Sequence, residues 1–252
     1  MIFSLNNKTI LITGASSGIG RACAVMCSQM GATVIGLGRD AGRLKETQSF
    51  LENPDRHTFI QIDLLDHDAL EVAISDAVSQ KGKINGMINS AGISTTLPLR
   101  MIKPDKMEEF FQINVKAAIN LARLVCKPAN VSPDGASLIF ITSVMATVGE
   151  SGKSLYAMTK GAILAATKSL AIELAPKNIR VNCISPGVVE TPMSAASPYS
   201  KNPEALDHIR SLHPLGLGKP NDVAAACVYL LSDAARWVTG SNLMVDGGYT
   251  AR

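Results

Sequence analysis

Residues 8–20 read Lys8-Thr9-Ile10-Leu11-Ile12-Thr13-Gly14-Ala15-Ser16-Ser17-Gly18-Ile19-Gly20, and they decide the fold of this chain. The apolar run at 9–13 is typical of a buried strand. Three glycines follow within seven residues, and a helical pattern then continues to Met30 and stops before Gly31. A strand, a glycine-rich turn and a helix in this order predict the first part of a dinucleotide-binding unit.

Each glycine of the turn has a physical reason to be there. Gly14 permits a tight turn, Gly18 lets backbone approach a pyrophosphate, and Gly20 lets the helix pack closely on the strand. The helix N-terminus presents free N–H groups and a partial positive charge to phosphates. The spacing is G-x-x-x-G-x-G rather than the common G-x-G-x-x-G. An ordinary strand-to-helix turn that uses glycine only for its shape is the alternative interpretation.

Strand and helix patterns alternate along the whole chain. The expected strands are 9–13, 33–37, 58–63, 86–90, 137–142, 180–185 and 242–245. The expected helices are 19–30, 41–51, 67–81, 106–127, 154–175 and 221–231. This alternation predicts an α/β fold: a Rossmann-type, doubly wound, seven-stranded parallel sheet with helices on both faces. No domain-scale linker interrupts it, so residues 1–252 are expected to form a single domain.

The stretch 190–220 departs from that alternation. It carries five prolines and is expected to form a long insertion with short helical pieces after the sixth strand. Ligands bind beyond the carboxyl ends of the strands in such sheets. The stretch is therefore predicted to be a substrate lid.

Ser143, Tyr156 and Lys160 form a candidate set for proton transfer. Tyr156 and Lys160 are four residues apart, so they share one face of a helix. A phenol loses its proton at about pH 10, and a neighbouring ammonium favours the phenolate. A serine hydroxyl brought close from another element can hold a substrate oxygen. The Tyr-x-x-x-Lys pair alone is a weak signal, because it also occurs on ordinary amphipathic helices.

Five motifs in register resemble the short-chain dehydrogenase/reductase family. They are Thr13–Gly20, Asn89-Ser90-Ala91-Gly92, Ser143 with Tyr156 and Lys160, Pro186-Gly187-Val188-Val189-Glu190-Thr191, and Val238-Thr239-Gly240 with Val245-Asp246-Gly247-Gly248. The resemblance covers about residues 5–249 and is greatest to bacterial 3-oxoacyl-acyl-carrier-protein reductases. It implies an oxidoreductase that uses a nicotinamide dinucleotide.

The resemblance assigns roles residue by residue. It implies a catalytic set of Asn114, Ser143, Tyr156 and Lys160, in which Asn114 anchors a water linked to Lys160. It implies cofactor contacts at Gly14, Ser16, Ser17, Gly18, Ile19, Gly20, Arg39, Asp63, Leu64, Asn89, Ala91, Gly92, Tyr156, Lys160, Pro186, Gly187, Val189 and Thr191. Ser90 stands where many relatives have asparagine. No metal is expected, because the four histidines are dispersed.

The end of the second strand bears on the choice of cofactor. A carboxylate just past this strand would bind a ribose 2′-hydroxyl and repel a 2′-phosphate. This chain has Gly38 there, followed by Arg39, and an arginine can bind phosphate through two parallel hydrogen bonds. NADP(H) is therefore favoured. NAD(H) stays open, because Ser17 stands where many NADP-preferring relatives carry a second basic residue and Asp40 is close enough to pair with Arg39.

Three functions are compatible with these residues. The first is reduction of a 3-oxoacyl thioester, either free or carried on an acyl carrier. The second is dehydrogenation of a sugar, polyol, steroid or small alcohol with the same four residues. The third is a non-catalytic dinucleotide sensor, against which the intact catalytic set argues.

Composition limits the partners and the compartment. The net charge is +3 and the basic residues are scattered, so no nucleic acid is expected. No apolar run reaches transmembrane length, and the five cysteines are predicted to be reduced in a cytoplasmic protein. The helices at 106–127 and 154–175 carry many small and apolar residues. These helices and the family resemblance predict a homotetramer.

Overall fold

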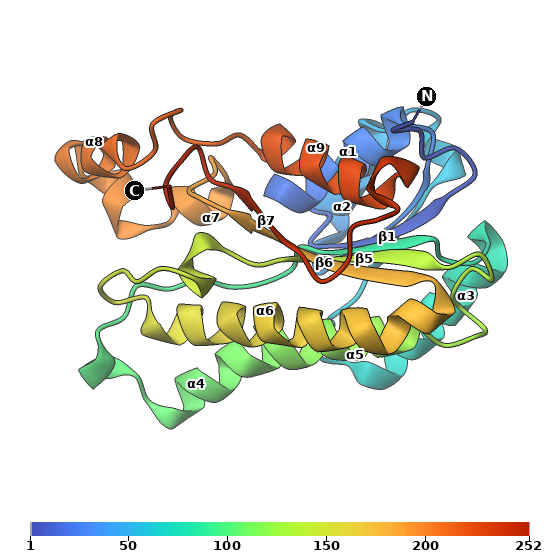
Figure 1. Cartoon of the computed structure of the whole chain (residues 1–252), viewed down its shortest axis with the longest axis horizontal. Coiled ribbons are helices and arrows are strands. Elements are labelled where there is room, and N and C mark those ends of the chain that lie inside the picture. Colours follow the sequence, from blue (N-terminus) through green and yellow to red (C-terminus); the bar gives the residue numbers. More distant parts are fainter. Residues whose placement is uncertain (1, 252) are drawn as a thin grey trace.

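A single seven-stranded sheet forms the centre of the computed structural model, which describes residues 2–251 (Figure 1). The strands are all parallel and lie in the order β3-β2-β1-β4-β5-β6-β7. They are β1 (Thr9–Thr13), β2 (Thr33–Gly38), β3 (Thr58–Gln61), β4 (Gly86–Asn89), β5 (Ala136–Ile141), β6 (Ile179–Pro186) and β7 (Asn242–Val245). The predicted doubly wound parallel sheet is confirmed.

Helices cover both faces of this sheet (Figure 1). One face carries α1 (Gly18–Gln29), α2 (Ala41–Ser49) and α9 (Pro220–Leu231). The other carries α3 (His67–Lys81), α5 (Ala117–Val125) and α6 (Ser154–Leu174), and α4 (Pro104–Phe111) leads into α5. A parallel sheet needs this double cover, because its strands are apolar on both sides.

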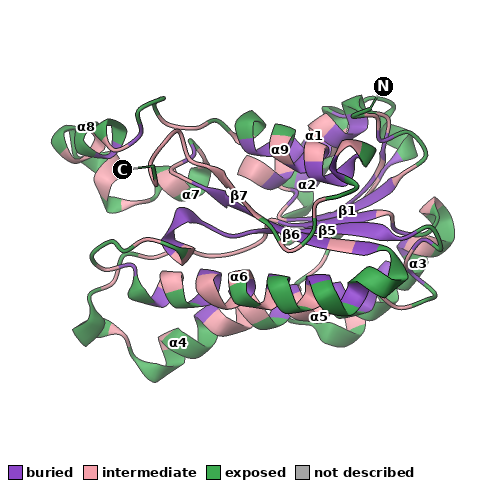
Figure 2. Ribbon diagram, viewed as in Figure 1, coloured by how far each residue is buried: buried purple, intermediate pink, exposed green. Residues whose placement is uncertain are grey.

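Alternating side chains of each strand feed two separate cores. On β1, Ile10 and Ile12 face the core under α1 and α9, whereas Leu11 faces the core over α3, α5 and α6. All three are fully buried. Each such side chain stabilises the fold by about 1.5–3 kcal/mol relative to an exposed one. Figure 2 shows the buried strands between helices whose outer surfaces are exposed.

The strand order reverses between β1 and β4, which lie side by side. Thr13 at the end of β1 pairs with Asn89 at the end of β4. The Thr13 hydroxyl donates to Asn89 Oδ1 at 3.0 Å and accepts from the Ser90 and Ala91 N–H groups at 3.1 Å each. Chains leaving β1 and β4 turn to opposite faces, which opens a crevice at this point.

One predicted helix contains a turn of a different kind. The expected single helix at 106–127 is α4 and α5 joined by a π-helical turn, Gln112–Lys116. Asn114 lies within this turn and is buried, with 2% of its surface exposed. A π-helical turn widens the backbone locally and occurs frequently at functional sites.

The 190–220 stretch contains the short helices α7 (Pro192–Ala195) and α8 (Pro203–Ser211), as expected. They lie at the end of the molecule where α6 begins (Figure 1). All five cysteines lie in the described part of the chain and are free thiols. Among residues 2–251, no helix is both long enough and apolar enough to cross a bilayer.

Candidate active site

A cavity of about 680 Å³ opens at the carboxyl ends of β1, β2 and β4. Its walls come from the glycine turn, the end of β2, the residues after β3 and β4, the π-helical turn and the start of α7. The lining residues that the sequence predicted are Gly14, Ser16, Ser17, Gly18, Ile19, Arg39, Asp63, Leu64, Ala91, Gly92 and Thr191. Most of the predicted cofactor contacts therefore lie around one cavity.

The glycine turn is shaped as the sequence predicted. Gly14 and Gly18 have φ values of 67° and 52°, which favour glycine. A Cβ on Gly20 would lie 2.2 Å from the Gly14 carbonyl oxygen, so only glycine lets α1 pack this closely on the turn. Ser17 precedes α1, and no side chain caps the helix there. The N–H groups of the first turn of α1 are thus left for an anion.

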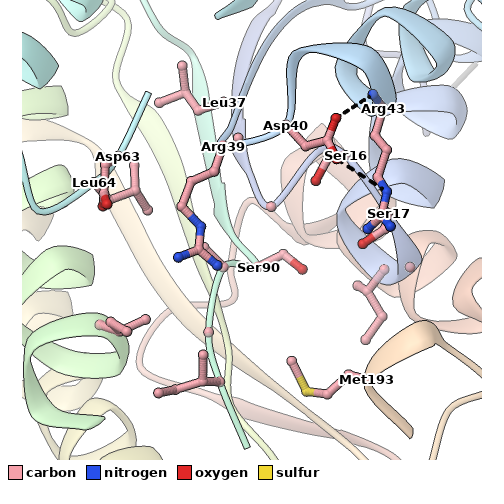
Figure 3. A pocket seen from close by; sticks show the side chains of 18 of the residues that line it. Ser16, Ser17, Leu37, Arg39, Asp40, Arg43, Asp63, Leu64, Ser90 and Met193 are labelled. Carbon is pink, nitrogen blue, oxygen red and sulfur yellow. Dashed lines mark hydrogen bonds and ion pairs between the residues drawn. The ribbon is translucent and has the colours of Figure 1, made fainter. Parts of the chain in front are cut away.

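Two arginines lie beside the end of β2. Arg39 extends into the cavity between Leu64 and Ser90, while Asp40 turns toward Arg43 (Figure 3). Asp40 accepts from the Arg43 N–H at 3.0 Å and forms an ion pair of 3.4 Å with the Arg43 guanidinium. Asp40 therefore pairs with Arg43, not with Arg39. The Arg39 carbonyl oxygen is held by the Gln61 amide at 3.1 Å.

Two predicted cofactor contacts, Asn89 and Gly20, line neither this cavity nor the adjoining one that holds Tyr156. Asn89 is buried beneath it, where its amide oxygen accepts from Thr13. Gly20 supports the turn through its packing. Ser90, which is not among the predicted cofactor contacts, also lines the cavity, next to Ala91 and Gly92. Arg43 was also missed, because a surface position in the first turn of a helix gives no distinguishing signal.

Ser143, Tyr156 and Lys160 meet in a second cavity of about 160 Å³. Ser143 follows β5, while Tyr156 and Lys160 lie one turn apart in α6, as their spacing predicted. The Lys160 Nζ donates to the Ile141 carbonyl at 2.8 Å and lies 5.7 Å from the centroid of the Tyr156 ring. The two cavities share Ile19, Ser90, Gly92, Ile93, Thr191 and Met193, so they are continuous.

The titration of this set differs from the prediction. Lys160 was expected to lower the pKa of Tyr156. Instead, burial raises the pKa of Tyr156 to about 12, and the hydrogen bond with Ser143 offsets only part of that rise. Burial also lowers the pKa of Lys160 to about 8. Both shifts have one cause: a dry site penalises the charged form of each group.

Asn114 connects three parts of the site. Its amide N–H group donates to the Ile93 carbonyl and to Thr159 Oγ1, both at 3.0 Å, and its oxygen accepts from the Ile93 N–H at 2.8 Å. A Cβ on Gly92 would lie 3.1 Å from Asn114 Oδ1 and 3.5 Å from Lys160 Nζ. Asn114 and Lys160 thus converge where Gly92 leaves room.

The loop after β6 forms the remaining wall. Pro186, Gly187 and Val189 line the cavity beside Tyr156, and Thr191 caps α7 by accepting from the Ser194 N–H at 3.2 Å.

His213, buried beside α8, accepts from the Val188 N–H at 3.0 Å through Nε2 and bonds the Ile209 carbonyl at 2.8 Å through Nδ1. His213 was missed because a lone histidine gives no sequence signal for such a bridge.

The residues present fit a nicotinamide dinucleotide. The uncapped α1 and the glycine turn suit a pyrophosphate, and a Cβ on Gly18 would come within 3.2 Å of Thr191 Cγ2. Asp63 and Leu64 border one end of the first cavity, and the second cavity lies at the other end. This geometry accommodates a long ligand with a charged middle.

A family model described as "Enoyl-(Acyl carrier protein) reductase" matches residues 14–250. The chain belongs to the short-chain dehydrogenase/reductase family. It is therefore an oxidoreductase that acts on a carbonyl or an alcohol with a nicotinamide dinucleotide.

Relatives within this family have different substrates. The chain is 34% identical to the 3-oxoacyl-[acyl-carrier-protein] reductase of Thermotoga maritima, over 97% of this chain and 98% of that protein. It is 31% identical to the cyclopentanol dehydrogenase of Comamonas testosteroni, over 98% of each chain. A solved structure of a putative NAD(P)-dependent gluconate 5-dehydrogenase from Beutenbergia cavernae, with bound NADP at low occupancy, superposes with a TM-score of 0.91 at 30% identity and full coverage of both chains.

Proposed function

We propose that this protein reduces the keto group of a 3-oxoacyl thioester to a secondary alcohol with NADP(H). The observation that carries the proposal is the convergence of Ser143, Tyr156 and Lys160 on a pocket continuous with the dinucleotide cavity. The 34% identity to a 3-oxoacyl-[acyl-carrier-protein] reductase supports the choice of substrate class. A small-alcohol substrate is the second candidate, supported by the 31% identity to a cyclopentanol dehydrogenase.

The proton step follows from the titration of Tyr156. With a pKa of about 12, its phenol keeps its proton at neutral pH and can donate it to a carbonyl oxygen. Ser143 holds that oxygen by a hydrogen bond and orients it toward Tyr156. Lys160, anchored on the Ile141 carbonyl, stabilises the negative charge that remains on Tyr156 after transfer. Asn114 is hydrogen-bonded to Ile93 in the loop after β4, beside Lys160. In this proposal it also binds a water that positions Lys160.

The cofactor is held by the residues around the first cavity. When bound, its nicotinamide supplies the hydride that the carbonyl carbon receives. The first turn of α1 binds the pyrophosphate, Asp63 and Leu64 border the adenine, and Lys160 bonds the nicotinamide ribose. Thr191 and the Val189 backbone bind the carboxamide, with Pro186 and Gly187 shaping that wall. Arg39 binds the 2′-phosphate, which favours NADP(H) over NAD(H).

The setting of the site completes the proposal. The chain forms one cytoplasmic domain, and residues 190–220, with α7 and α8, close over the substrate as a lid. Four copies assemble into a homotetramer. Two features favour assembly: large apolar side chains are exposed on α6, and β7 lies at an edge of the sheet.

A substrate panel tests the proposed function. Acetoacetyl thioester, cyclopentanone, a sugar and a polyol are assayed with NADPH or NADH, or with the oxidised cofactors for the alcohols. We expect the largest kcat/KM for the thioester with NADPH. A larger kcat/KM for cyclopentanone would favour the second candidate. Cofactor binding without turnover of any member would contradict both.

A further inference from the structure

Lys153 is a charged residue of the substrate pocket that the proposed chemistry does not use. It lies three residues before Tyr156 and lines the same cavity as Tyr156 and Ser143. Its side chain is 9% exposed, which is unusual for a lysine. Buried charges are ordinarily paired, because removing a charge from water is costly.

The Lys153 ammonium is held by no hydrogen bond or ion pair within the part of the chain that the structure describes. Among residues 2–251, it makes no hydrogen bond and no ion pair, whereas the Lys160 ammonium is bound to the Ile141 carbonyl. Every fully buried side-chain nitrogen or oxygen in this range does have a hydrogen-bond partner. The Lys153 Nζ must therefore keep contact with solvent, and the pocket that it lines provides that contact.

The position of Lys153 in the fold does not explain its charge. Lys153 is the residue that immediately precedes α6, and no acidic residue lies in the first turn of that helix. The N-terminus of a helix carries a partial positive charge, so an ammonium there is unfavourable. The helix end and the ammonium instead favour an anion or an electron-rich oxygen at the same place.

The other groups around the pocket leave this preference in place. Glu150 also lines the cavity, but its side chain is exposed and forms no ion pair with Lys153. Its charge helps keep Lys153 protonated, against the lowering of the pKa by burial. Tyr199 and Ser197 reach the cavity from the lid segment, and apolar walls come from Met145, Val188 and Ile209. Lys153 is thus a cation without a hydrogen bond or ion pair, in a pocket whose other charged residues are Lys160 and Glu150.

We propose that Lys153 is a substrate-binding residue that receives a second oxygen group of the substrate, beside the carbonyl held by Ser143 and Tyr156. The shared chemistry is an oxygen acceptor: the carboxylate of a 3-oxo acid or the C1 carbonyl of a 3-oxoacyl thioester. The inference rests on the proposed function for the identity of the reacting carbonyl. It adds that a plain ketone lacks one of the two anchors that this pocket offers.

Substrate pairs test this role by kinetics. The substrates are acetoacetate, the acetoacetyl thioester of N-acetylcysteamine, and 2-pentanone, which has no second oxygen. Lys153→Met keeps most of the length of the side chain and removes the charge. Lys153→Arg keeps the charge, and Lys168→Met on the exposed side of α6 is the matched control. We expect Lys153→Met to raise KM at least about tenfold for the physiological type of substrate, acid or thioester, and to leave 2-pentanone unchanged.

The two sources separate within the same experiment. A larger loss for acetoacetate than for the thioester assigns a carboxylate substrate, and the reverse assigns a thioester. Recovery in Lys153→Arg but not in a neutral variant shows that charge is the property required. An equal loss for all three substrates, or no loss for any, would overturn the assignment.

A binding measurement keeps this result separate from the proposed reaction. Calorimetry with acetoacetate and its thioester is carried out on NADPH-loaded Tyr156→Phe, which blocks turnover, with and without Lys153→Met. We expect Lys153→Met to weaken the binding of acetoacetate or of its thioester at least about tenfold and to leave NADPH affinity unchanged. If binding depends on Lys153 but the wild type turns over none of the substrates, the proposed reaction alone is contradicted. Turnover without any Lys153 dependence would contradict the Lys153 assignment alone.

Discussion

Asn114 donates a 3.0 Å hydrogen bond to Thr159 Oγ1, and the same hydroxyl donates to the Tyr156 carbonyl at 2.8 Å. The π-helical turn and the helix that carries Tyr156 and Lys160 are therefore joined through one buried hydroxyl. Thr159 is fully buried, so water cannot replace its hydroxyl. We expect the position of α6 against Asn114 to depend on this contact.

Thr159→Val should expose that dependence. The variant keeps the shape of the side chain and leaves the Asn114 amide without one buried acceptor, which costs about 1–3 kcal/mol of unfolding free energy. We also expect a fall in kcat, because Lys160 and Tyr156 follow the helix. Thr159→Ser, which keeps the hydroxyl, is the matched control. Urea unfolding and steady-state kinetics measure both effects, and equal behaviour of the two variants would refute the role of the hydroxyl.

Arg39→Ala tests the cofactor preference. Arg39 is free to meet a 2′-phosphate because Asp40 is occupied by Arg43. A charge-assisted hydrogen bond contributes about 1.5–3 kcal/mol, so KM for NADPH should rise by about tenfold or more. KM for NADH should change little, and Arg123→Ala on α5 should change neither. A wild-type preference for NADH would show that the reasoning from Gly38 and Arg39 is wrong.

His57 should make the fold sensitive to acid. Its Nδ1 accepts from the Val34 N–H at 3.0 Å, and its Nε2 bonds the Glu52 carbonyl at 2.8 Å. This arrangement needs a neutral ring, and burial, the main cause, lowers the pKa of His57. Because the pKa of His57 is lower in the folded state than in the unfolded state, the neutral ring stabilises the fold above the unfolded-state pKa of about 6.5. This stability is lost as the pH falls from there through the folded-state pKa.

Urea unfolding between pH 8 and pH 5 checks the contribution of His57. The unfolding free energy of the wild type should fall toward pH 5, and the fall should be smaller in His57→Gln. His208→Gln, at an exposed position on α8, should behave as the wild type does. An identical fall in His57→Gln would assign the acid sensitivity to other groups.

Assembly should depend on the outer face of α6. Ile172 on this helix is 77% exposed, which is costly for so large an apolar side chain in water. Light scattering at micromolar concentration should give a mass about four times 26.6 kDa. Ile172→Lys should lower that mass, whereas Val72→Lys, at an exposed apolar position on α3, should not. A wild-type mass near 26.6 kDa would contradict the proposed tetramer.

Local sequence patterns predicted the fold, and the family resemblance supplied most of the residues that line the cofactor cavity. The strand, glycine turn and helix at 9–29 depend on neighbours in the chain, so their pattern is readable directly. The same holds for Tyr156 and Lys160, whose spacing places them on one helix face. Short-range patterns therefore predicted the order of the strands and helices and placed Tyr156 and Lys160 on one helix.

The features that sequence reasoning missed depend on distant partners. The π-helical turn at Asn114 is satisfied by Ile93 and Thr159, which are 21 and 45 residues away. Lys153 lies in a pocket whose walls include Tyr199 and Ile209, which are far from it in the sequence. His213 likewise bonds Val188, which belongs to the loop after β6. Burial also raises the Tyr156 pKa instead of lowering it, because desolvation of the phenolate outweighs the hydrogen bond with Ser143.

Turnover by Tyr156→Phe is the most direct test of the central claim, that Tyr156 gives its proton to the carbonyl oxygen. The measurement is kcat at saturating cofactor and substrate, with cofactor affinity measured separately and Tyr229→Phe on α9 as the matched control. We expect cofactor affinity to stay nearly unchanged and kcat to fall by about 10²–10⁴, the contribution of general acid catalysis. A kcat close to that of the wild type would contradict it.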